Sequence, residues 1–257
     1  MTAFADLHHA DEPLLLPNAW DHASAAALAD AGFGAIGTTS LGVAAAAGLP
    51  DGAAATREAT LRLARGLGTG HFLLSVDAEG GFSEDPEQVA ELARELRSAG
   101  AVGINLEDGL GPAAVHAAKI AAVKSAVPDL FVNARTDTYW LGDGDPRDTR
   151  SRLDAYRQAG ADGVFVPGLA EPQHIAELVR SVEVPLNILY SPSGPSLPQL
   201  ADLGVRRVSL GSLLYRQALG AAVAAAKTVR SGHRPEGTAP SYDEVQALVP
   251  SRPEARG

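Results

Sequence analysis

Residues 97–105, RSAGAVGIN, contain the end of a helical pattern, a glycine and the start of a strand. Gly100 is suited to the left-handed backbone position that follows a helix, and the β-rich run begins directly after it. The same arrangement recurs at 29–37, ADAGFGAIG; at 157–166, RQAGADGVFV; and at 201–211, ADLGVRRVSLG. This repetition predicts a chain in which helices lead straight into strands.

The rest of the chain follows the same alternation. Strands are predicted at 14–18, 35–40, 72–77, 102–107, 130–136, 163–167, 185–189 and 207–211. Helices are predicted at 23–31, 57–67, 86–99, 113–126, 147–159, 172–181, 197–203 and 213–230. Eight such units with nearly continuous apolar strands indicate an α/β fold of the (β/α)8 TIM-barrel type. The alternative is a doubly wound open sheet, but 16–24, LPNAWDHAS, is not a glycine-rich phosphate loop.

Composition limits the classes of partner and chemistry. The 257 residues carry a formal net charge of -10 and include no Cys. The negative charge disfavours nucleic acid and anionic membranes as partners, and no apolar run approaches the roughly 20 residues of a membrane span. The lack of Cys excludes thiol catalysis and fits a reducing compartment. Because residues 1–12 show no secretory pattern, we expect a cytoplasmic protein.

The C-terminal part of the chain differs from the rest. We expect one catalytic barrel domain at 1–232 and a C-terminal arm at 233–257, which contains Pro and Gly and then a short amphipathic pattern. The preceding helical pattern, 213–229, has Ala or Gly at nearly every position on two faces. Small residues on both faces predict burial against a second copy in a dimer or tetramer. The alternative is that alanine is simply a strong helix former.

Polar side chains follow the predicted strands, and barrel enzymes hold their active sites at those strand ends. Residues 73–82, LLSVDAEGGF, end an apolar run with two carboxylates. The alternation of side chains gives three neighbouring strands polar residues on one face each: Asp77 and Glu79; Asn105 and Glu107; Asn133, Arg135 and Asp137. Because Asp77, Glu79 and Glu107 would repel one another there, we predict a divalent cation with oxygen ligands, Mg²⁺ or Mn²⁺.

Several of these residues also have structural interpretations. A carboxylate after a strand often caps the next helix, as Asp85 before Pro86 is expected to do. Asp108 points away from Glu107 and is predicted to be structural. Arg135 could be a buried ion-pair partner, although its two-pronged geometry favours a grip on a substrate carboxylate. No lysine follows a strand, so the remaining groups are a metal, an arginine, backbone N–H groups and hydroxyls, a set suited to stabilising an enolate.

Four segments in order carry a resemblance to a known family: 17–52, PNAWDHASAAALADAGFGAIGTTSLGVAAAAGLPDG; 76–81, VDAEGG; 103–109, GINLEDG; and 133–139, NARTDTY. They resemble the isocitrate lyase and phosphoenolpyruvate mutase superfamily, and within it the carboxyphosphonoenolpyruvate-phosphonomutase-like group. The resemblance implies a (β/α)8 barrel, a single Mg²⁺, and chemistry on 2-oxo acids through an enolate of pyruvate. It also implies paired barrels that exchange their last helix and assemble as tetramers.

The resemblance further implies roles for individual residues. Asp77 matches the family's direct metal ligand, and Glu79 and Glu107 match residues that hold the metal's waters. Asp51 matches an acidic residue near the bound substrate, and Arg135 matches the arginine that contacts it. The implied catalytic residues are thus Asp51, Glu107 and Arg135, and the predicted substrate-binding residues are Arg135, the backbone of Thr39, Ser40 and Leu41, and Asn133.

The chain departs from the family at two points. The family's lyases carry a catalytic Cys, so its absence argues against ordinary isocitrate or methylisocitrate cleavage. Residues 109–112, GLGP, lead directly into a helix with no charged gate residue before His116. We predict an Mg²⁺-dependent lyase or phosphonomutase-type enzyme acting on a small anionic 2-oxo acid or its enol phosphate. The alternatives are a barrel that binds a metal and an oxo acid without turnover, as a sensor or inactive paralogue, and a barrel that serves only in assembly.

Overall fold

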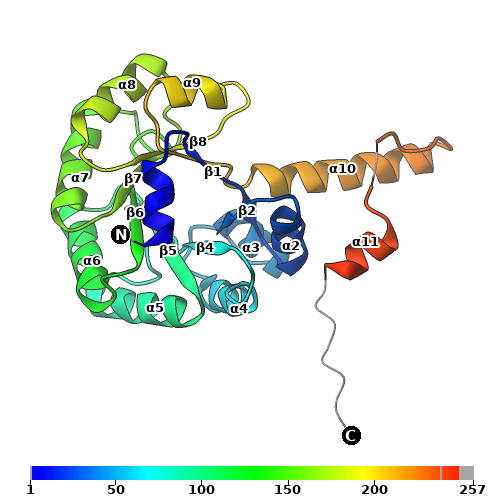
Figure 1. Cartoon of the computed structure of the whole chain (residues 1–257), viewed down its shortest axis with the longest axis horizontal. Helices are drawn as coiled ribbons and strands as arrows, with labels where there is room; N and C mark the ends of the chain where they lie inside the picture. Colours follow the sequence, from blue (N-terminus) through cyan, green and yellow to red (C-terminus); the bar gives the residue numbers. More distant parts are fainter. Residues whose placement is uncertain (1, 238, 249–257) are drawn as a thin grey trace, which may run out of the picture.

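The structure is a computed structural model that describes residues 2–237 and 239–248. Nine parallel strands form one sheet in the order β1-β9-β8-β7-β6-β5-β4-β3-β2. Strand β1 (Leu14–Leu16) pairs with β9 (Arg207–Ser209), and β2 (Asn18–Ala19) pairs with β3 (Ala35–Thr38). Because β1 and β2 are adjacent in the chain, the two ends of the sheet meet and form a barrel (Figure 1). The predicted (β/α)8 fold is confirmed.

The remaining elements agree closely with the predicted ranges. The strands are β4 (Leu73–Asp77), β5 (Ala101–Glu107), β6 (Phe131–Arg135), β7 (Gly163–Val166) and β8 (Leu186–Leu189). The helices around them are α2 (His22–Asp30), α4 (Arg57–Leu67), α5 (Pro86–Ser98), α6 (Ala113–Ala126), α7 (Pro146–Gln158), α8 (Pro172–Ser181) and α9 (Leu197–Asp202). The predicted first strand is the exception, since it is divided at Pro17 between β1 and β2.

Some short elements were not predicted. They are α1 (Ala3–Asp6), the 3₁₀ helix η1 (Leu7–His9), α3 (Ser40–Ala47) and α11 (Tyr242–Ala247). Helix α3 reads SLGVAAAA and is apolar on every side, so it gives no amphipathic pattern. Helix α11 lies in the predicted arm, and residues 238 and 249–257 of that arm lie outside the described residues.

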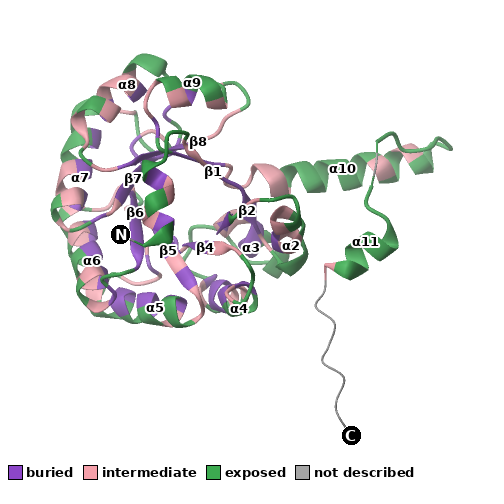
Figure 2. Ribbon diagram, viewed as in Figure 1, coloured by how far each residue is buried: buried purple, intermediate pink, exposed green. Residues whose placement is uncertain are grey.

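Two apolar clusters separate the inside of the barrel from its outer layer. Outward-facing strand residues such as Ile104 and Val132 pack beneath the surrounding helices. Inside the barrel, Leu16, Ala35 and Phe131 form a small cluster that Phe4 of α1 covers. Figure 2 shows these buried residues on the strands and on the inner sides of the helices. The strand ends opposite α1 are therefore left to carry polar residues.

Helix α10 (Leu213–Arg230) contacts the barrel at its first turn, where the Tyr215 ring lies 5.3 Å from that of Trp20, and then extends away from it (Figure 1). None of its residues is buried, and Figure 2 shows it mostly exposed beyond its partly buried first turn. Its large apolar side chains are half-open, with Leu219 50%, Val223 53% and Val229 60% exposed. Among the helices of residues 2–237 and 239–248, none combines the length and apolar character that a membrane crossing requires.

Candidate active site

The carboxyl ends of the strands surround a cavity of about 110 Å³. It is much smaller than the roughly 300–1,000 Å³ pockets of drug-sized ligands, so it suits a molecule of few heavy atoms. Six of the residues predicted for catalysis, metal binding or substrate binding line it: Thr39, Ser40, Leu41, Asp51, Asp77 and Arg135. Asn18, Asn105, Trp140, Phe165 and Ser209 are among the others. The barrel thus brings residues from distant parts of the sequence into one small space.

Helix α3 begins at the edge of this cavity. The backbone N–H of Ser40 donates to Asp77 Oδ2 at 3.2 Å, and the N–H of Asp77 donates to Thr38 Oγ1 at 2.9 Å. The side chain of the N-cap residue, Thr39, makes no capping hydrogen bond. The remaining N–H groups of its first turn and the positive end of its dipole therefore favour an anion beside Leu41.

Arg135 supplies a cation to the same cavity. Its Nη1 lies 2.7 Å from Glu107 Oε2, its Nε lies 2.6 Å from Asp137 Oδ1, and its guanidinium is 5.8 Å from the centre of the Phe165 ring. Burial opposes the charge on Arg135, yet Glu107, Asp137 and Asp77 together raise its pKa. Arg135 therefore stays protonated. It forms buried ion pairs with Glu107 and Asp137, as one of the two sequence-based hypotheses expected, and it also lines the cavity, as the other requires.

Glu79 and Glu107 line a second, neighbouring cavity of about 620 Å³. Glu79 is buried in the left-handed conformation (φ 47) and accepts a hydrogen bond from Thr56 Oγ1. Burial raises the pKa of Glu79, and Asp51 and Asp77 add to the effect. Burial also raises the pKa of Glu107, to about 8, because the other carboxylates nearby oppose the influence of Arg135. These shifts reflect negative charge that lacks sufficient compensation.

The donor set fits a hard divalent cation that keeps part of its water shell. Within the described part of the chain, no three His, Asp or Glu side chains lie close enough together to enclose a metal ion. Mg²⁺ commonly binds through only one or two carboxylates and several waters. The carboxylate oxygens near Asp77, together with the raised pKa of Asp51 and Glu79, therefore suit Mg²⁺ better than a fully protein-enclosed ion.

Two residues of the predicted mouth take other positions. Asn133 does not line the cavity; its Nδ2 donates to Asn105 Oδ1 at 2.9 Å, and its contact with the substrate stays a prediction. Asp108 accepts hydrogen bonds from Tyr156 (2.7 Å) and Thr136 (2.8 Å), and its Oδ2 is 3.1 Å from Arg152 Nη1. Burial opposes its charge, but hydrogen bonds led by that of Tyr156 lower its pKa. Asp108 is accordingly structural, as expected.

Two residues near the cavity were not singled out from the sequence. Ser209 lines it, and Arg207 lies buried beneath it on the same inward face of β9. The alternation of side chains along 207–211 was the available signal, because it places positions 207, 209 and 211 on one face. An arginine inside a barrel strand was overlooked because arginine is rarely fully buried.

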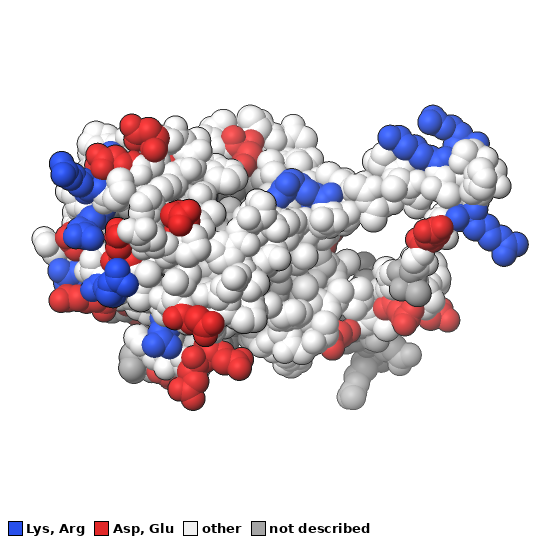
Figure 3. All heavy atoms as spheres, turned by 90° about the horizontal axis from the view of Figure 1, so that it is seen from above, with Lys and Arg blue, Asp and Glu red and all other residues white. Residues whose placement is uncertain are grey.

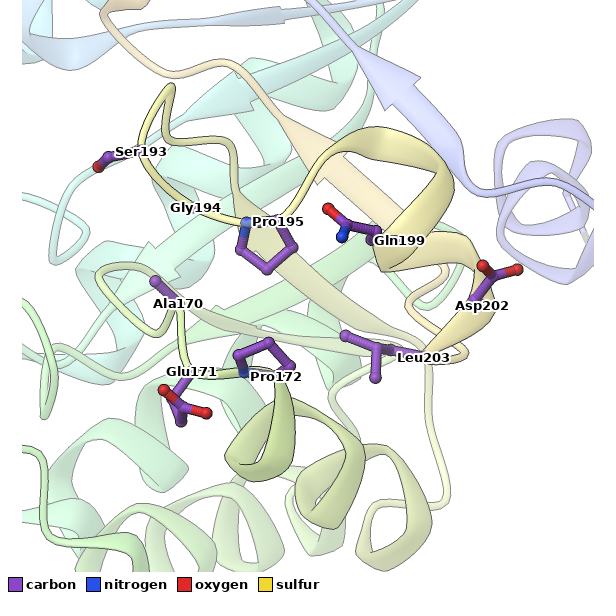
Figure 4. Close-up of a pocket in the computed structure, with 9 residues that line it drawn as sticks. All are labelled: Ala170, Glu171, Pro172, Ser193, Gly194, Pro195, Gln199, Asp202 and Leu203. Carbon is purple, nitrogen blue, oxygen red and sulfur yellow. The ribbon is translucent and has the colours of Figure 1, made fainter.

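A larger hollow is elsewhere, between the segments that lead into α8 and α9 (Figure 4). It measures about 690 Å³ and is lined by Ala170, Glu171, Pro172, Ser193, Gly194, Pro195, Gln199, Asp202 and Leu203. Figure 4 shows its two carboxylates, Glu171 and Asp202, at opposite ends instead of converging. Without converging polar groups it is the weaker candidate, and the small cavity at the strand ends is the candidate active site.

The chain shares this TIM barrel with solved lyases and mutases. The chain belongs to the phosphoenolpyruvate phosphomutase family, whose model matches residues 4–230. Structural neighbours and homologues of this chain are members of the phosphoenolpyruvate mutase and isocitrate lyase superfamily, as the sequence motifs suggested.

Individual relatives match over nearly the whole chain. An uncharacterised protein of Mycobacterium tuberculosis is 46% identical over 252 residues, which cover 96% of both chains. The crystal structure of a protein from Burkholderia cenocepacia J2315, with a provisional lyase/mutase assignment, is 37% identical, has a TM-score of 0.86, and covers 97% of this chain and 95% of its own. A phosphonopyruvate hydrolase solved with oxalate and Mg²⁺ is 25% identical, with a TM-score of 0.83, over 96% of this chain and 93% of its own.

Proposed function

We propose that this protein is an Mg²⁺-dependent lyase or phosphonomutase-type enzyme acting on a small 2-oxo acid or its enol phosphate. The observation that carries the proposal is the cavity of about 110 Å³ in which Asp77, Arg135 and the N-terminus of α3 meet. It offers a carboxylate for a metal, and a guanidinium and a helix end for an anion. A small molecule with two neighbouring anionic or carbonyl groups matches all three.

Asp77 is the proposed direct ligand of Mg²⁺, and Mn²⁺ could replace it. Glu79 and Glu107 would hold the waters of the ion, because neither lines the smaller cavity with Asp77. Asp51 is proposed to lie beside the bound substrate, on the turn that reaches over the cavity. When bound, the ion supplies stabilisation of the negative charge that develops on the oxygens of an enolate.

The substrate carboxylate is proposed to lie between Arg135 and the first turn of α3. Arg135 is held by Glu107 and Asp137 in a fixed orientation, which lowers the cost of ordering it on binding. The backbone N–H of Leu41 would complete the contact. The N–H groups of Thr39 and Ser40 donate to the Ala19 carbonyl and to Asp77 Oδ2, both at 3.2 Å, and would join the contact only on exchanging those bonds for the substrate. In catalysis, the positive charge of Arg135 would stabilise negative charge on the reacting oxygens, and Glu107 would hold or release a proton near them.

Oxalate is the appropriate probe for this site, because one of its carboxylates corresponds to the carboxylate of a pyruvate enolate and the other to the carbon that carries the enolate oxygen. Calorimetry should show oxalate binding in the presence of Mg²⁺ and none in the presence of a chelator. Absence of Mg²⁺-dependent oxalate binding to the intact protein would refute the proposal. Pyruvate release from a panel of 2-oxo acid precursors would then identify the leaving group.

A second candidate function is a barrel that binds the metal and an oxo acid without turnover. Its support is the short connection after β5, where Leu110 donates its N–H to Asp108 Oδ1 (3.0 Å) and Gly111 donates to the Asp108 carbonyl (2.8 Å). This tight turn carries no ionisable side chain toward the cavity. Oxalate binding without turnover of any precursor would favour this candidate.

Replacement of Arg135 by lysine should weaken Mg²⁺-dependent oxalate binding by roughly 1.5–3 kcal/mol, the worth of a hydrogen bond to a charged group. A lysine keeps the positive charge but cannot contact Glu107, Asp137 and a ligand with the same planar geometry. Calorimetric affinities of Arg135→Lys and wild type test this. Unchanged affinity would assign Arg135 a purely structural role.

We propose that α10 packs on a second copy of this chain. As a surface helix it would need a polar outer face, yet it exposes Leu219, Val223 and Val229 and buries nothing. Figure 3 shows basic side chains at the far end of the arm, where α10 contributes Lys227 and Arg230, with acidic side chains near them, and side chains of both charges on the barrel. The exposed apolar side chains of α10 are therefore the basis for proposing a second copy as the occupant.

On this proposal, the barrel domain and C-terminal arm of one chain pack against those of other copies to form a dimer or tetramer. Light scattering should give a mass of at least two chains for the intact protein. A chain ending at Gly211 should dissociate or fail to fold, because it lacks α10 and therefore the apolar side chains that are proposed to contact the second copy. A monomeric intact protein would rule the idea out.

The lack of Cys supports the cytoplasm as the proposed location.

A further inference from the structure

A buried arginine lies directly beneath the candidate active site. Arg207 is 1% exposed, and its side chain extends along the barrel interior toward the cavity floor. Its Nη2 donates to Asn105 Oδ1 at 3.1 Å, and its Nε donates to Ser209 Oγ at 3.1 Å. Burial lowers the pKa of Arg207 to about 9, so it remains charged at neutral pH. Both of its acceptors line the cavity.

Arg207 determines which way the amide of Asn105 points. A guanidinium has five donors and no acceptor, so only the carbonyl oxygen of the amide can face it. Asn133 Nδ2 donates to the same Oδ1 at 2.9 Å, which occupies both lone pairs of that oxygen. The reversed amide would set two N–H donors of Asn105 against the donors of Arg207. The orientation of Asn105 therefore follows from the chemistry of its neighbour.

Because Oδ1 of Asn105 is occupied, the Nδ2 group is the part of this amide that can donate a hydrogen bond into the cavity. Within the described residues, Asn105 Nδ2 donates no hydrogen bond. It is also not one of the fully enclosed polar atoms without a partner, so it is accessible from the cavity. In the sheet, Asn105 is paired with Asp77 on one side and with Asn133 on the other. Its amide donors thus lie beside the proposed metal ligand.

We propose that Asn105 Nδ2 donates to an oxygen of the bound oxo acid, and that Arg207 is a positioning residue that holds this amide in the donating orientation. The proposal rests on the proposed function and adds a third contact to those of Arg135 and α3. It explains why the barrel buries a guanidinium with no carboxylate partner: the described residues give Arg207 two neutral acceptors and no ion pair. The ligand class is a small anion with an oxygen facing the cavity floor.

The decisive variant is Asn105→Asp, which replaces only the NH₂ group by an oxygen. The new carboxylate would still accept from Arg207 and would pair with its charge, so the melting temperature should be equal to or above that of wild type. The oxygen facing the cavity would repel an anion. Asn105→Ala removes a hydrogen bond to a charged group and should weaken Mg²⁺-dependent oxalate binding roughly tenfold. Asn105→Asp should weaken it by more than that, because repulsion is added to the lost hydrogen bond.

A matched control separates this contact from a general effect of added negative charge. Asn187 is also buried, exchanges hydrogen bonds with Ser209 at 3.0 and 3.2 Å, and does not line the cavity. The change Asn187→Asp introduces the same charge outside the cavity. Oxalate affinity should be lost much more strongly in Asn105→Asp than in Asn187→Asp. Equal losses in the two variants would overturn the assignment of Asn105.

The positioning role of Arg207 is tested by a double-mutant cycle in oxalate affinity. Arg207→Met should weaken binding because the amide of Asn105 becomes free to turn, and Arg207→Lys should restore part of the loss. When Asn105→Ala is already present, adding Arg207→Met should cause no further loss, because Arg207 acts through that amide. Additive losses would show that Arg207 acts independently and would refute this role. If Arg207→Met does not fold, Arg207→Lys measured with and without Asn105→Ala gives the same cycle.

These results are distinguishable from failure of the proposed function. If wild type binds no oxalate with Mg²⁺, the proposed function itself fails. If wild type binds oxalate and Asn105→Asp binds it equally well, only the present inference fails. Circular dichroism and thermal melting accompany each titration, so that a lost affinity in a destabilised variant is not counted as support.

Discussion

Replacing Asp77 by alanine should abolish Mg²⁺-dependent oxalate binding and leave the melting temperature within a few degrees of wild type. Asp77 accepts one side-chain hydrogen bond, from the N–H of Ser40 at 3.2 Å, and the loss of that bond costs stability. Its removal also relieves repulsion among neighbouring carboxylates, since Asp77 contributes to the raised pKa of Asp51, Glu79 and Glu107. The two effects oppose each other in the free energy of unfolding.

Asp85→Ala is the matched control for Asp77→Ala. Asp85 caps α5 by accepting from the N–H of Glu87 at 3.0 Å, and it lies outside the cavity. Its removal should cost about 1 kcal/mol of stability and leave oxalate affinity unchanged. The two variants should thus show opposite patterns in calorimetry and thermal melting. A large fall in melting temperature with unchanged Mg²⁺ affinity in Asp77→Ala would show that Asp77 is structural.

The sequence predicted the elements whose signals are local. Helix α5 begins at Pro86 after the Asp85 cap and ends just before Gly100, and both signals are readable in the chain. Helix α3 was missed because its apolar residues have no period. The division of the first strand at Pro17 was also missed, because it depends on two different pairing partners, β9 and β3, that are distant in the sequence.

The same distinction applies to the site. Alternation along strands placed Asp77, Glu107 and Arg135 at one end of the barrel, and the structure brings Asp77 and Arg135 to one cavity. Alternation cannot give depth along the barrel axis, so it does not distinguish Asn105, which lines the cavity, from its strand neighbour Asn133, which does not. The burial of Arg207 also required the fold, because its two acceptors, Asn105 and Ser209, come from different strands.

The metal-free protein should lose stability as the pH rises from about 5 to about 8, relative to a Glu107→Gln variant. Burial and the neighbouring carboxylates raise the pKa of Glu107 to about 8 in the folded chain, above its ordinary value of 4.5. Between these values the folded state binds more protons than the unfolded state, so the free energy of unfolding falls with pH. The limit is about 1.4 kcal/mol for each pH unit. Asp51, Glu79 and Asp137 shift in the same direction.

Glutamine at position 107 cannot ionise and keeps an oxygen that can accept from Arg135, so it removes the titration with little change of shape. Denaturant unfolding of wild type and Glu107→Gln, with a chelator present, should give a stability difference that moves in favour of glutamine as the pH rises. Adding Mg²⁺ to wild type should reverse this trend, because a cation near Asp77 stabilises the ionised form of the nearby Glu107. The same slope in both proteins would mean that Glu107 ionises normally in the folded state. A trend that Mg²⁺ leaves unchanged would instead mean that no cation binds near Glu107, which would remove the electrostatic basis of the proposed metal site.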